Sequence, residues 1–120
     1  MAHVNYYKWI KLIENVIKKY IKKENIIIFE IGGGTGTLAK MLMKKGYSYV
    51  GSDLSFEMCK ESIKKGVPFF CCDGRNLPLK KEYDLVIFLY DGINYLQSLT
   101  EYTQLFFSVY NCLQKEGFFL

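Results

Sequence analysis

Glycine is concentrated in the segment FEIGGGTGTLAK, residues 29–40, where Gly32, Gly33, Gly34 and Gly36 fill four of five consecutive positions. An apolar run precedes these glycines and a helix-like run follows them. Glycine permits positive φ angles and lets a ligand approach the main chain, while the free amides at a helix N-terminus attract an anionic group. A tight strand-to-helix turn needs fewer glycines, so the segment predicts a loop that holds a ligand.

Four acidic residues stand at or just beyond the ends of successive predicted strands: Glu30, Asp53, Asp73 and Asp91. In an open parallel sheet, the ligand crevice lies outside the carboxyl ends of the strands. At any single position, the more ordinary interpretation is a carboxylate in a turn or at a helix N-terminus. Four carboxylates at the same edge indicate a negatively charged binding rim.

Strands and helices alternate along the part of the chain that must position these residues. Apolar and β-branched runs predict buried strands at residues 26–31, 47–52, 67–71 and 83–90. Helical spacing predicts a first helix over residues 5–23, whose apolar stripe is Tyr6, Trp9, Ile13, Val16 and Tyr20.

Capping residues mark the ends of the three later predicted helices. Thr35 or Thr37 begins a helix that runs to Lys45, with Gly46 as its left-handed C-terminal residue. Ser55 begins the next helix, which carries Phe56, Cys59 and Ile63 on one face and ends at Gly66. Ser98 and Glu101 form a capping box for a helix over residues 98–115 with the stripe Leu99, Tyr102, Phe106, Val109 and Leu113. Gly117 ends this helix, and residues 118–120 open a fifth strand. The alternation implies an open parallel α/β sheet covered by helices.

The 120 residues, 1–120, fit one domain. No apolar stretch approaches the roughly 20 residues that cross a bilayer, and no signal peptide opens the chain, so we expect a soluble, cytoplasmic protein. The four cysteines have neither disulfide nor zinc spacing, so we expect reduced core or near-core thiols and no metal. The net charge of +4 comes from lysines placed where helices should end, which does not indicate nucleic acid.

Two ligand classes fit the glycine segment. Residues 34–39, GTGTLA, satisfy the dinucleotide pattern G-x-G-x-x-A, which alone is a weak signal. In the other register, Glu30, Gly32, Gly34 and Gly36 form a motif that resembles the first motif of class I S-adenosylmethionine-dependent methyltransferases.

The resemblance extends in order over about four-fifths of the chain. VGSDLSFEM (50–58), CDGRNLP (72–78), YDLVIFLYDGINYL (83–96) and LQKEGFFL (113–120) resemble the family's later segments; the last keeps Lys115 and Gly117 and has Glu116 where proline is usual. The resemblance implies a Rossmann-like sheet with strand order 3-2-1-4-5, helices on both faces and truncation after the start of strand five. It implies Asp53 at the ribose hydroxyls and Asp73 near the exocyclic amine. The implied cofactor-binding residues are Glu30, Gly32, Gly33, Gly34, Gly36, Asp53, Leu54, Met58, Asp73, Gly74, Arg75 and Tyr90.

A carboxylate rim suits this cofactor, because S-adenosylmethionine carries a sulfonium and an ammonium, whereas the rim would repel a pyrophosphate. Methyl transfer requires chiefly alignment and the exclusion of water. Asp91, Asn94 and Tyr95 are the catalytic candidates that would face the methyl group. Tyr6 or Tyr7 is a further candidate, because the first helix packs over the cofactor in similar proteins. No nucleobase motif or basic aromatic groove is present, so we expect a small-molecule acceptor.

Both flanks of the usual family domain are missing from these 120 residues. The first hypothesis is a methyltransferase that produces S-adenosylhomocysteine. The alternatives are a non-catalytic fragment that binds S-adenosylmethionine, half of a split enzyme, or a nicotinamide-dinucleotide oxidoreductase domain. An uncovered fifth strand bearing Phe118 and Phe119 also predicts self-association through its edge.

Overall fold

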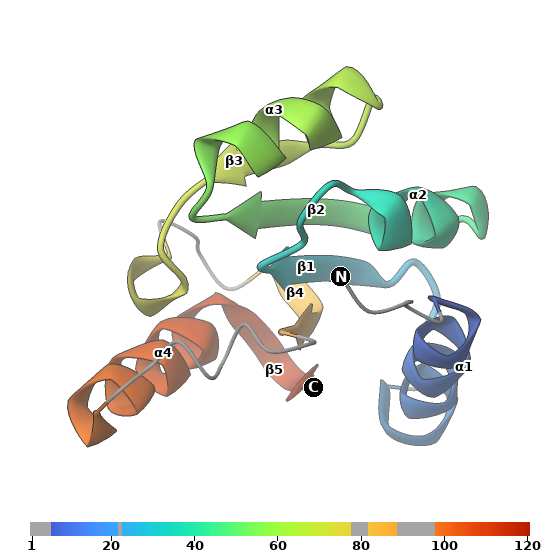
Figure 1. Cartoon of the computed structure of the whole chain (residues 1–120). Helices are drawn as coiled ribbons and strands as arrows, with labels where there is room; N and C mark the ends of the chain where they lie inside the picture. Colours follow the sequence, from blue (N-terminus) through green and yellow to red (C-terminus); the bar gives the residue numbers. More distant parts are fainter. Residues whose placement is uncertain (1–5, 22, 78–81, 89–97) are drawn as a thin grey trace.

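Five parallel strands form the sheet, in the order β3-β2-β1-β4-β5 (Figure 1). The computed structural model describes residues 6–21, 23–77, 82–88 and 98–120. The strands are β1 (Ile27–Ile31), β2 (Ser48–Asp53), β3 (Phe69–Cys71), β4 (Tyr83–Ile87) and β5 (Leu113–Phe119). The predicted Rossmann-like α/β class and strand order are confirmed.

Helices cover both faces of the sheet (Figure 1). They are α1 (Tyr6–Val16), continued by the π-helical η1 (Ile17–Ile21), α2 (Thr37–Lys44), α3 (Phe56–Lys64), the short 3-10 helix η2 (Gly74–Asn76) and α4 (Leu99–Cys112). The helices α1 and α2 pack on one face, and α4 packs on the other. No described helix combines the length and the apolar character that a membrane span requires.

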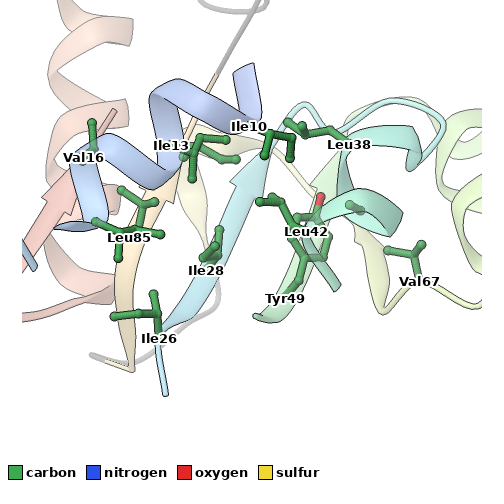
Figure 2. Packing of buried hydrophobic residues seen from close by; sticks show 13 residues of the cluster. Ile10, Ile13, Val16, Ile26, Ile28, Leu38, Leu42, Tyr49, Val67 and Leu85 are labelled. Atoms are coloured by element: carbon green, nitrogen blue, oxygen red, sulfur yellow. The ribbon is translucent and has the colours of Figure 1, made fainter. Parts of the chain in front are cut away.

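Strand β1 is buried on both sides, which explains its unbroken apolar sequence. Ile28 packs with Ile13 of α1 and Leu42 of α2, as Figure 2 shows. Phe29 points to the opposite face, where it meets Val109 of α4. All five of these side chains are at most 2% exposed. The glycine segment therefore follows a strand that is held between two packed layers.

Most helix ends match the predicted caps. The Ser55 hydroxyl accepts the Met58 amide, and the Ser98 hydroxyl accepts the Glu101 amide. Gly46 and Gly66 have φ angles of 95° and 81°, as left-handed C-terminal residues should. The predicted threonine cap of α2 is wrong: Gly36 is the N-cap, at φ 83°, and no side chain caps this helix.

The predicted faces of α3 and α4 are wrong in part, because only Cys59 of the first and Val109 of the second are buried among the apolar residues named for each. In α3, Cys59 and Ser62 are buried, whereas Phe56 and Ile63 are exposed. In α4, the buried residues are Leu105, Ser108, Val109 and Cys112, whereas Leu99 and Phe106 are exposed. Both helices carry apolar residues around much of their circumference, so spacing alone did not identify the inward face.

The end of α4 also differs from the prediction. The helix stops at Cys112, and Leu113 already pairs with Tyr83 of β4. The register then shifts, so that Leu85 pairs with Phe118. Gly117 lies inside β5 rather than at a helix end, and a Cβ atom there would lie 2.9 Å from the Gln114 carbonyl oxygen. Close packing within the irregular strand therefore explains this glycine.

A buried carboxylate joins the beginnings of β1 and β4. Asp84 is 4% exposed and accepts hydrogen bonds from the Ile27 amide at 2.9 Å and the Lys23 ammonium at 2.8 Å. Because these atoms lie at the starts of the strands, the contact is at the end of the sheet opposite the glycine segment. Asp84 therefore has a structural role that the sequence interpretation did not identify.

We expect Asp84→Ala to lower the free energy of unfolding by about 2 kcal/mol, because the Ile27 amide loses its acceptor in a buried setting. The matched variant Lys23→Ala should cost less than about 1 kcal/mol, because this side chain is nearly half exposed and solvent screens the pair. Urea unfolding of both variants measures the difference. Equal losses would contradict this role for Asp84.

Candidate functional site

The glycine loop, residues 32–36, joins β1 to α2 and has an unusual backbone. Gly32, Gly34 and Gly36 have φ angles of 68°, 64° and 83°, in the left-handed region that favours glycine. Three hydrogen bonds hold the loop from outside. The Gly33 amide donates to the Ser52 carbonyl at 2.9 Å, the Gly34 amide donates to Asp53 Oδ2 at 3.0 Å, and the Ser62 hydroxyl donates to the Gly34 carbonyl at 2.9 Å. The loop is therefore fixed by β2 and α3.

The positions of this loop require glycine for different physical reasons. A Cβ atom on Gly33 would lie 2.7 Å from the Phe69 ring, and one on Gly36 would lie 3.0 Å from the Ser62 hydroxyl. Packing within the protein excludes side chains at these two positions. At Gly34, a Cβ atom would have nothing within 4 Å. The main chain at Gly34 is therefore the part of the loop that a ligand can approach without displacing protein atoms.

Asp53 stands beside Gly34 at the end of β2. Its Oδ2 accepts the Gly34 amide, and its Oδ1 accepts the Ser55 amide at 2.9 Å. A carboxylate offers about four acceptor positions, so these two bonds leave about one position on each oxygen. Two neighbouring hydroxyl groups of a ligand would match this arrangement.

Apolar side chains lie next to Asp53. Leu54 is 67% exposed, and Met58, on the first turn of α3, is 40% exposed. Neither is part of the two core clusters. A flat apolar ligand group could cover these side chains, which are otherwise in contact with water.

Asp73 forms an ion pair with Arg75. It caps η2 by accepting the Arg75 amide, and both of its oxygens accept the Arg75 Nε at 3.0 Å. The same guanidinium donates to Glu101 of α4 at 3.0 Å. The hydrogen bond from the Arg75 side chain lowers the pKa of Asp73. Asp73 and Arg75 thus tie η2 to α4, which sequence spacing alone did not suggest.

Gly74, inside η2, is buried, and a Cβ atom there would lie 2.8 Å from the Ile31 side chain. This glycine allows η2 to pack closely against the end of β1. Its predicted contact with a cofactor stays a prediction.

Glu30 lies beneath the glycine loop rather than on an open rim. It is 1% exposed, its Oε1 accepts a hydrogen bond from the Tyr49 hydroxyl, and its Oε2 has no hydrogen-bond partner. The pKa of Glu30 is raised to about 7, chiefly by burial; the Tyr49 hydrogen bond opposes this increase, and the nearby Asp53 contributes to it. Glu30 is therefore a buried group that is partly protonated near neutral pH, and the predicted rim of four ionised carboxylates needs this correction.

Tyr49 and Ser62 are the supporting residues that sequence interpretation missed. The Tyr49 hydroxyl reaches Glu30 and lies 3.0 Å from the Cβ position of Gly33, while Ser62 holds the Gly34 carbonyl. A small polar residue three positions after Cys59, on the same face of α3, was the available signal for Ser62. Nothing local marked Tyr49, because its partner comes from a neighbouring strand.

The remaining predicted residues lie outside the described part of the chain. These are Tyr90 and the catalytic candidates Asp91, Asn94 and Tyr95. On α1, Tyr7 is 78% exposed. Within the described ranges, no three His, Cys, Asp or Glu side chains gather closely enough to hold a metal ion.

Glu30 should make stability depend on pH. Its folded pKa of about 7 lies above the unfolded value of 4.5, so its protonated form is stabilised by folding. This contribution is complete below pH 4.5 and disappears as the pH rises through about 7, a loss of about 3 kcal/mol. Asp73 contributes with the opposite sign, but only at more acidic pH, because its pKa is lowered from 3.8.

We expect Glu30→Gln to remove the loss of stability between pH 4.5 and pH 7 and to be more stable than the unchanged chain above that range. The glutamine amide can keep a hydrogen bond to Tyr49 without carrying a charge. Urea unfolding across this pH range tests the expectation. Parallel pH curves for the two chains would show that Glu30 does not titrate in this window.

Comparison with known proteins gives consistent results. Residues 28–117 match the family described as Methyltransferase domain. YqeM of Bacillus subtilis (strain 168), a protein named as a methyltransferase, is 31% identical over 126 residues, which cover 100% of this chain and 49% of YqeM. A crystal structure of an S-adenosylmethionine-dependent methyltransferase from Clostridium acetobutylicum ATCC 824 has a TM-score of 0.85 and 28% identity, covering 97% of this chain and 49% of that chain.

A more distant likeness supports the fold alone. The S-adenosylmethionine-bound structure of CalS10, an amino pentose methyltransferase from Micromonospora echinaspora, has a TM-score of 0.81 at 18% identity and covers 92% of this chain and 47% of that chain. The chain spans about half the length of the curated relatives it matches. The matched range contains the glycine loop, Asp53 and Asp73 in the order that the family resemblance implied. The chain belongs to the class I S-adenosylmethionine-dependent methyltransferases.

Proposed function

We propose that this chain binds S-adenosylmethionine along the glycine loop and transfers its methyl group to a small-molecule acceptor. The observation that carries the proposal is the pairing of an open main chain at Gly34 with the Asp53 carboxylate beside it. Family membership makes S-adenosylmethionine the expected ligand of such a pair. The unit that binds it would be the single domain formed by residues 1–120.

The described residues fit the chemical groups of this cofactor. The two acceptor positions left on Asp53 suit the neighbouring ribose hydroxyls, because hydrogen bonds to a charged acceptor are strong. Leu54 and Met58 offer apolar surface next to them for the adenine ring. Asp73, Gly74 and Arg75 stand at the adjacent strand end, and their proposed role is at the adenine edge.

The buried Glu30 suits the cationic end of the cofactor. Its Oε2 has no hydrogen-bond partner, and a nearby positive charge would favour its ionised form. Gly32, Gly33 and Gly36 would shape the loop around Gly34. Gly33 leaves room for the Phe69 ring, and Gly36 leaves room for Ser62. When bound, the cofactor supplies the methyl group as an activated sulfonium. What the protein must add is alignment of the acceptor and exclusion of water.

The acceptor side of the site is a proposal from sequence. Asp91, Asn94, Tyr95 and Tyr90 follow β4, whose carboxyl end lies beside that of β1. One of them would remove a proton if the acceptor keeps its proton at neutral pH. A small-molecule acceptor is proposed because the sequence contains neither a nucleobase-recognition motif nor a basic aromatic groove.

The second candidate is a cofactor-binding unit without catalysis, or half of a split enzyme. It requires only the cofactor side of the site, which is where Gly34 and Asp53 lie. Measured turnover with a panel of small acceptors, set against measured cofactor affinity, separates the two. Binding without turnover of any acceptor favours the second candidate.

We expect calorimetry to detect binding of S-adenosylmethionine and S-adenosylhomocysteine, but not NAD, and Gly34→Val to abolish it. A side chain at Gly34 would occupy the open space beside the main chain. Gly46→Val is the matched control, because Gly46 also has positive φ and nothing within 4 Å of its Cβ position, but stands at the far end of α2. Both variants carry similar backbone strain, so only a ligand at the loop distinguishes them.

The outcomes of this experiment are distinct. Circular dichroism and thermal unfolding establish whether both variants are folded. Normal binding by folded Gly34→Val would mean that the loop is only a turn. Preferential binding of NAD would replace the proposed cofactor class with a dinucleotide.

We also propose that the chain self-associates through β5 and the neighbouring face of α4. Strand β5 ends the order of the described sheet, and Phe106 of α4 packs edge-on against Phe119. Phe107, the next residue along α4, is 67% exposed. An apolar helix face beside a strand at the end of a sheet favours association.

Sedimentation over micromolar concentrations should show a mass that rises with concentration. Phe107→Glu should weaken this association at least about tenfold, since it places a charge in an apolar contact. Phe56→Glu is the matched control, because Phe56 is 65% exposed on α3 and not on this surface. A monomer at every concentration would contradict the proposal.

A further inference from the structure

Two cysteines from different elements meet beside the corner formed by Asp53 and Leu54. Cys59 lies on α3, and its thiol donates to the Asp53 carbonyl at 3.4 Å. Cys71 is the last residue of β3, and its thiol donates to the Leu54 carbonyl at 3.3 Å. The two acceptor carbonyls belong to consecutive residues, and Cys71 acts on the pKa of Cys59, so the two thiols are neighbours. They are separated by twelve positions in sequence, so the fold alone brings them together.

The alternation of β3 explains why Cys71 is the residue that meets Cys59. Side chains alternate between the faces of a strand, so Cys71 shares a face with Phe69, and Phe70 points to the other face. Phe69 packs against the cluster that contains α2, while Phe70 packs on Phe29. Cys59 is on the buried side of α3, which packs against β3.

The neighbouring Cys72 is directed elsewhere. The Ser52 side chain lowers the pKa of its thiol, against the larger raising effect of burial, and the Ser52 hydroxyl donates to the Glu30 carbonyl at 3.1 Å. By the same alternation, Cys72 belongs to the face opposite Cys71. Cys112, buried in α4, bonds to the Val109 carbonyl in the other core cluster. The geometry therefore selects Cys59 as the partner of Cys71.

The paired thiols differ in access to solvent. Cys71 is exposed, which corrects the expectation that all four cysteines are core or near-core thiols, and Cys59 is 3% exposed. Burial raises the pKa of Cys59 to about 11, which keeps it as a protonated thiol at neutral pH. The exposed thiol can react with an oxidant, and the buried thiol can then form a disulfide with the oxidised product. Redox-sensitive cysteine pairs have this arrangement.

We propose that Cys59 and Cys71 are a reversible thiol–disulfide modification site that lowers the affinity of the chain for its cofactor. The oxidant is a small peroxide. The Cys71 thiolate attacks one peroxide oxygen and becomes a sulfenic acid, and the other oxygen leaves as hydroxide. The Cys59 sulfur then displaces the sulfenic oxygen, which leaves as water with the Cys59 proton. A small-molecule dithiol reverses the reaction by thiol–disulfide exchange.

The effect on cofactor affinity rests on the proposed function. Disulfide formation removes both thiol protons, and with them the hydrogen bonds to the Asp53 and Leu54 carbonyls. These carbonyls belong to the corner that carries the Asp53 carboxylate and the exposed Leu54 side chain. The new bond also draws α3 toward β3, and Ser62 of α3 holds the Gly34 carbonyl. Oxidation thus acts on two supports of the proposed cofactor site.

Peroxide treatment of the 120-residue chain, followed by peptide mass mapping without reduction, tests the modification. We expect a Cys59–Cys71 linked peptide with the loss of two hydrogens, which dithiothreitol reverses. Cys72→Ser and Cys112→Ser should form it unchanged. Cys59→Ser should instead leave a Cys71 sulfenic acid that dimedone traps. A Cys71–Cys72 bond, or overoxidised Cys71 in the unchanged chain, would overturn the proposal.

Calorimetry on the oxidised and the reduced chain tests the coupling. We expect S-adenosylmethionine to bind about tenfold more weakly after oxidation, with recovery on reduction and no change in peroxide-treated Cys71→Ser. Equal affinity of both forms would overturn the coupling. If the reduced chain binds no S-adenosylmethionine, the proposed function fails, while peptide mapping still decides whether the disulfide forms.

Discussion

The carboxylate of Asp53 connects the glycine loop to the junction between β2 and α3, which lies 19 positions later in the sequence. It accepts the Gly34 amide from the glycine loop and the Ser55 amide at the start of α3, while Asp53 itself ends β2. The parallel register of β1 and β2, with Ile31 opposite Ser52, places it beside the loop. Without this register, the Gly34 amide would lose its acceptor, whereas the bond from the Ser55 amide is local.

Burial around β1 sets the electrostatic character of the site. Because both faces of this strand are covered, Glu30 is shielded from solvent and accepts a hydrogen bond from the Tyr49 hydroxyl. The Asp73 carboxylate is instead neutralised by Arg75, which also holds Glu101. Among the described acidic residues of the predicted rim, Asp53 is the one whose charge is neither buried nor offset by an ion pair. The negative potential offered to a ligand is therefore more localised than four carboxylates at one edge suggested.

Features with a local physical cause could be predicted from the sequence. Ser55 and Ser98 cap helices because a short hydroxyl side chain reaches amides two or three positions ahead, and Gly46 and Gly66 end helices because left-handed backbone disfavours other residues. Strand order followed from family resemblance together with the alternation of elements. The position of Asp53 at a strand end followed from the same reasoning.

Features that depend on which surfaces meet could not be predicted. The inward faces of α3 and α4 were misplaced in part, because Phe56 and Phe106 are as apolar as the residues that are buried. The sequence by itself determined where the glycine loop, the first four strands and most helix caps lie, since these depend on neighbours within a few positions. Tertiary structure alone decided that Gly33 makes room for Phe69, that Tyr49 meets Glu30 and that Cys59 meets Cys71, because each contact joins side chains from different elements across the packed sheet.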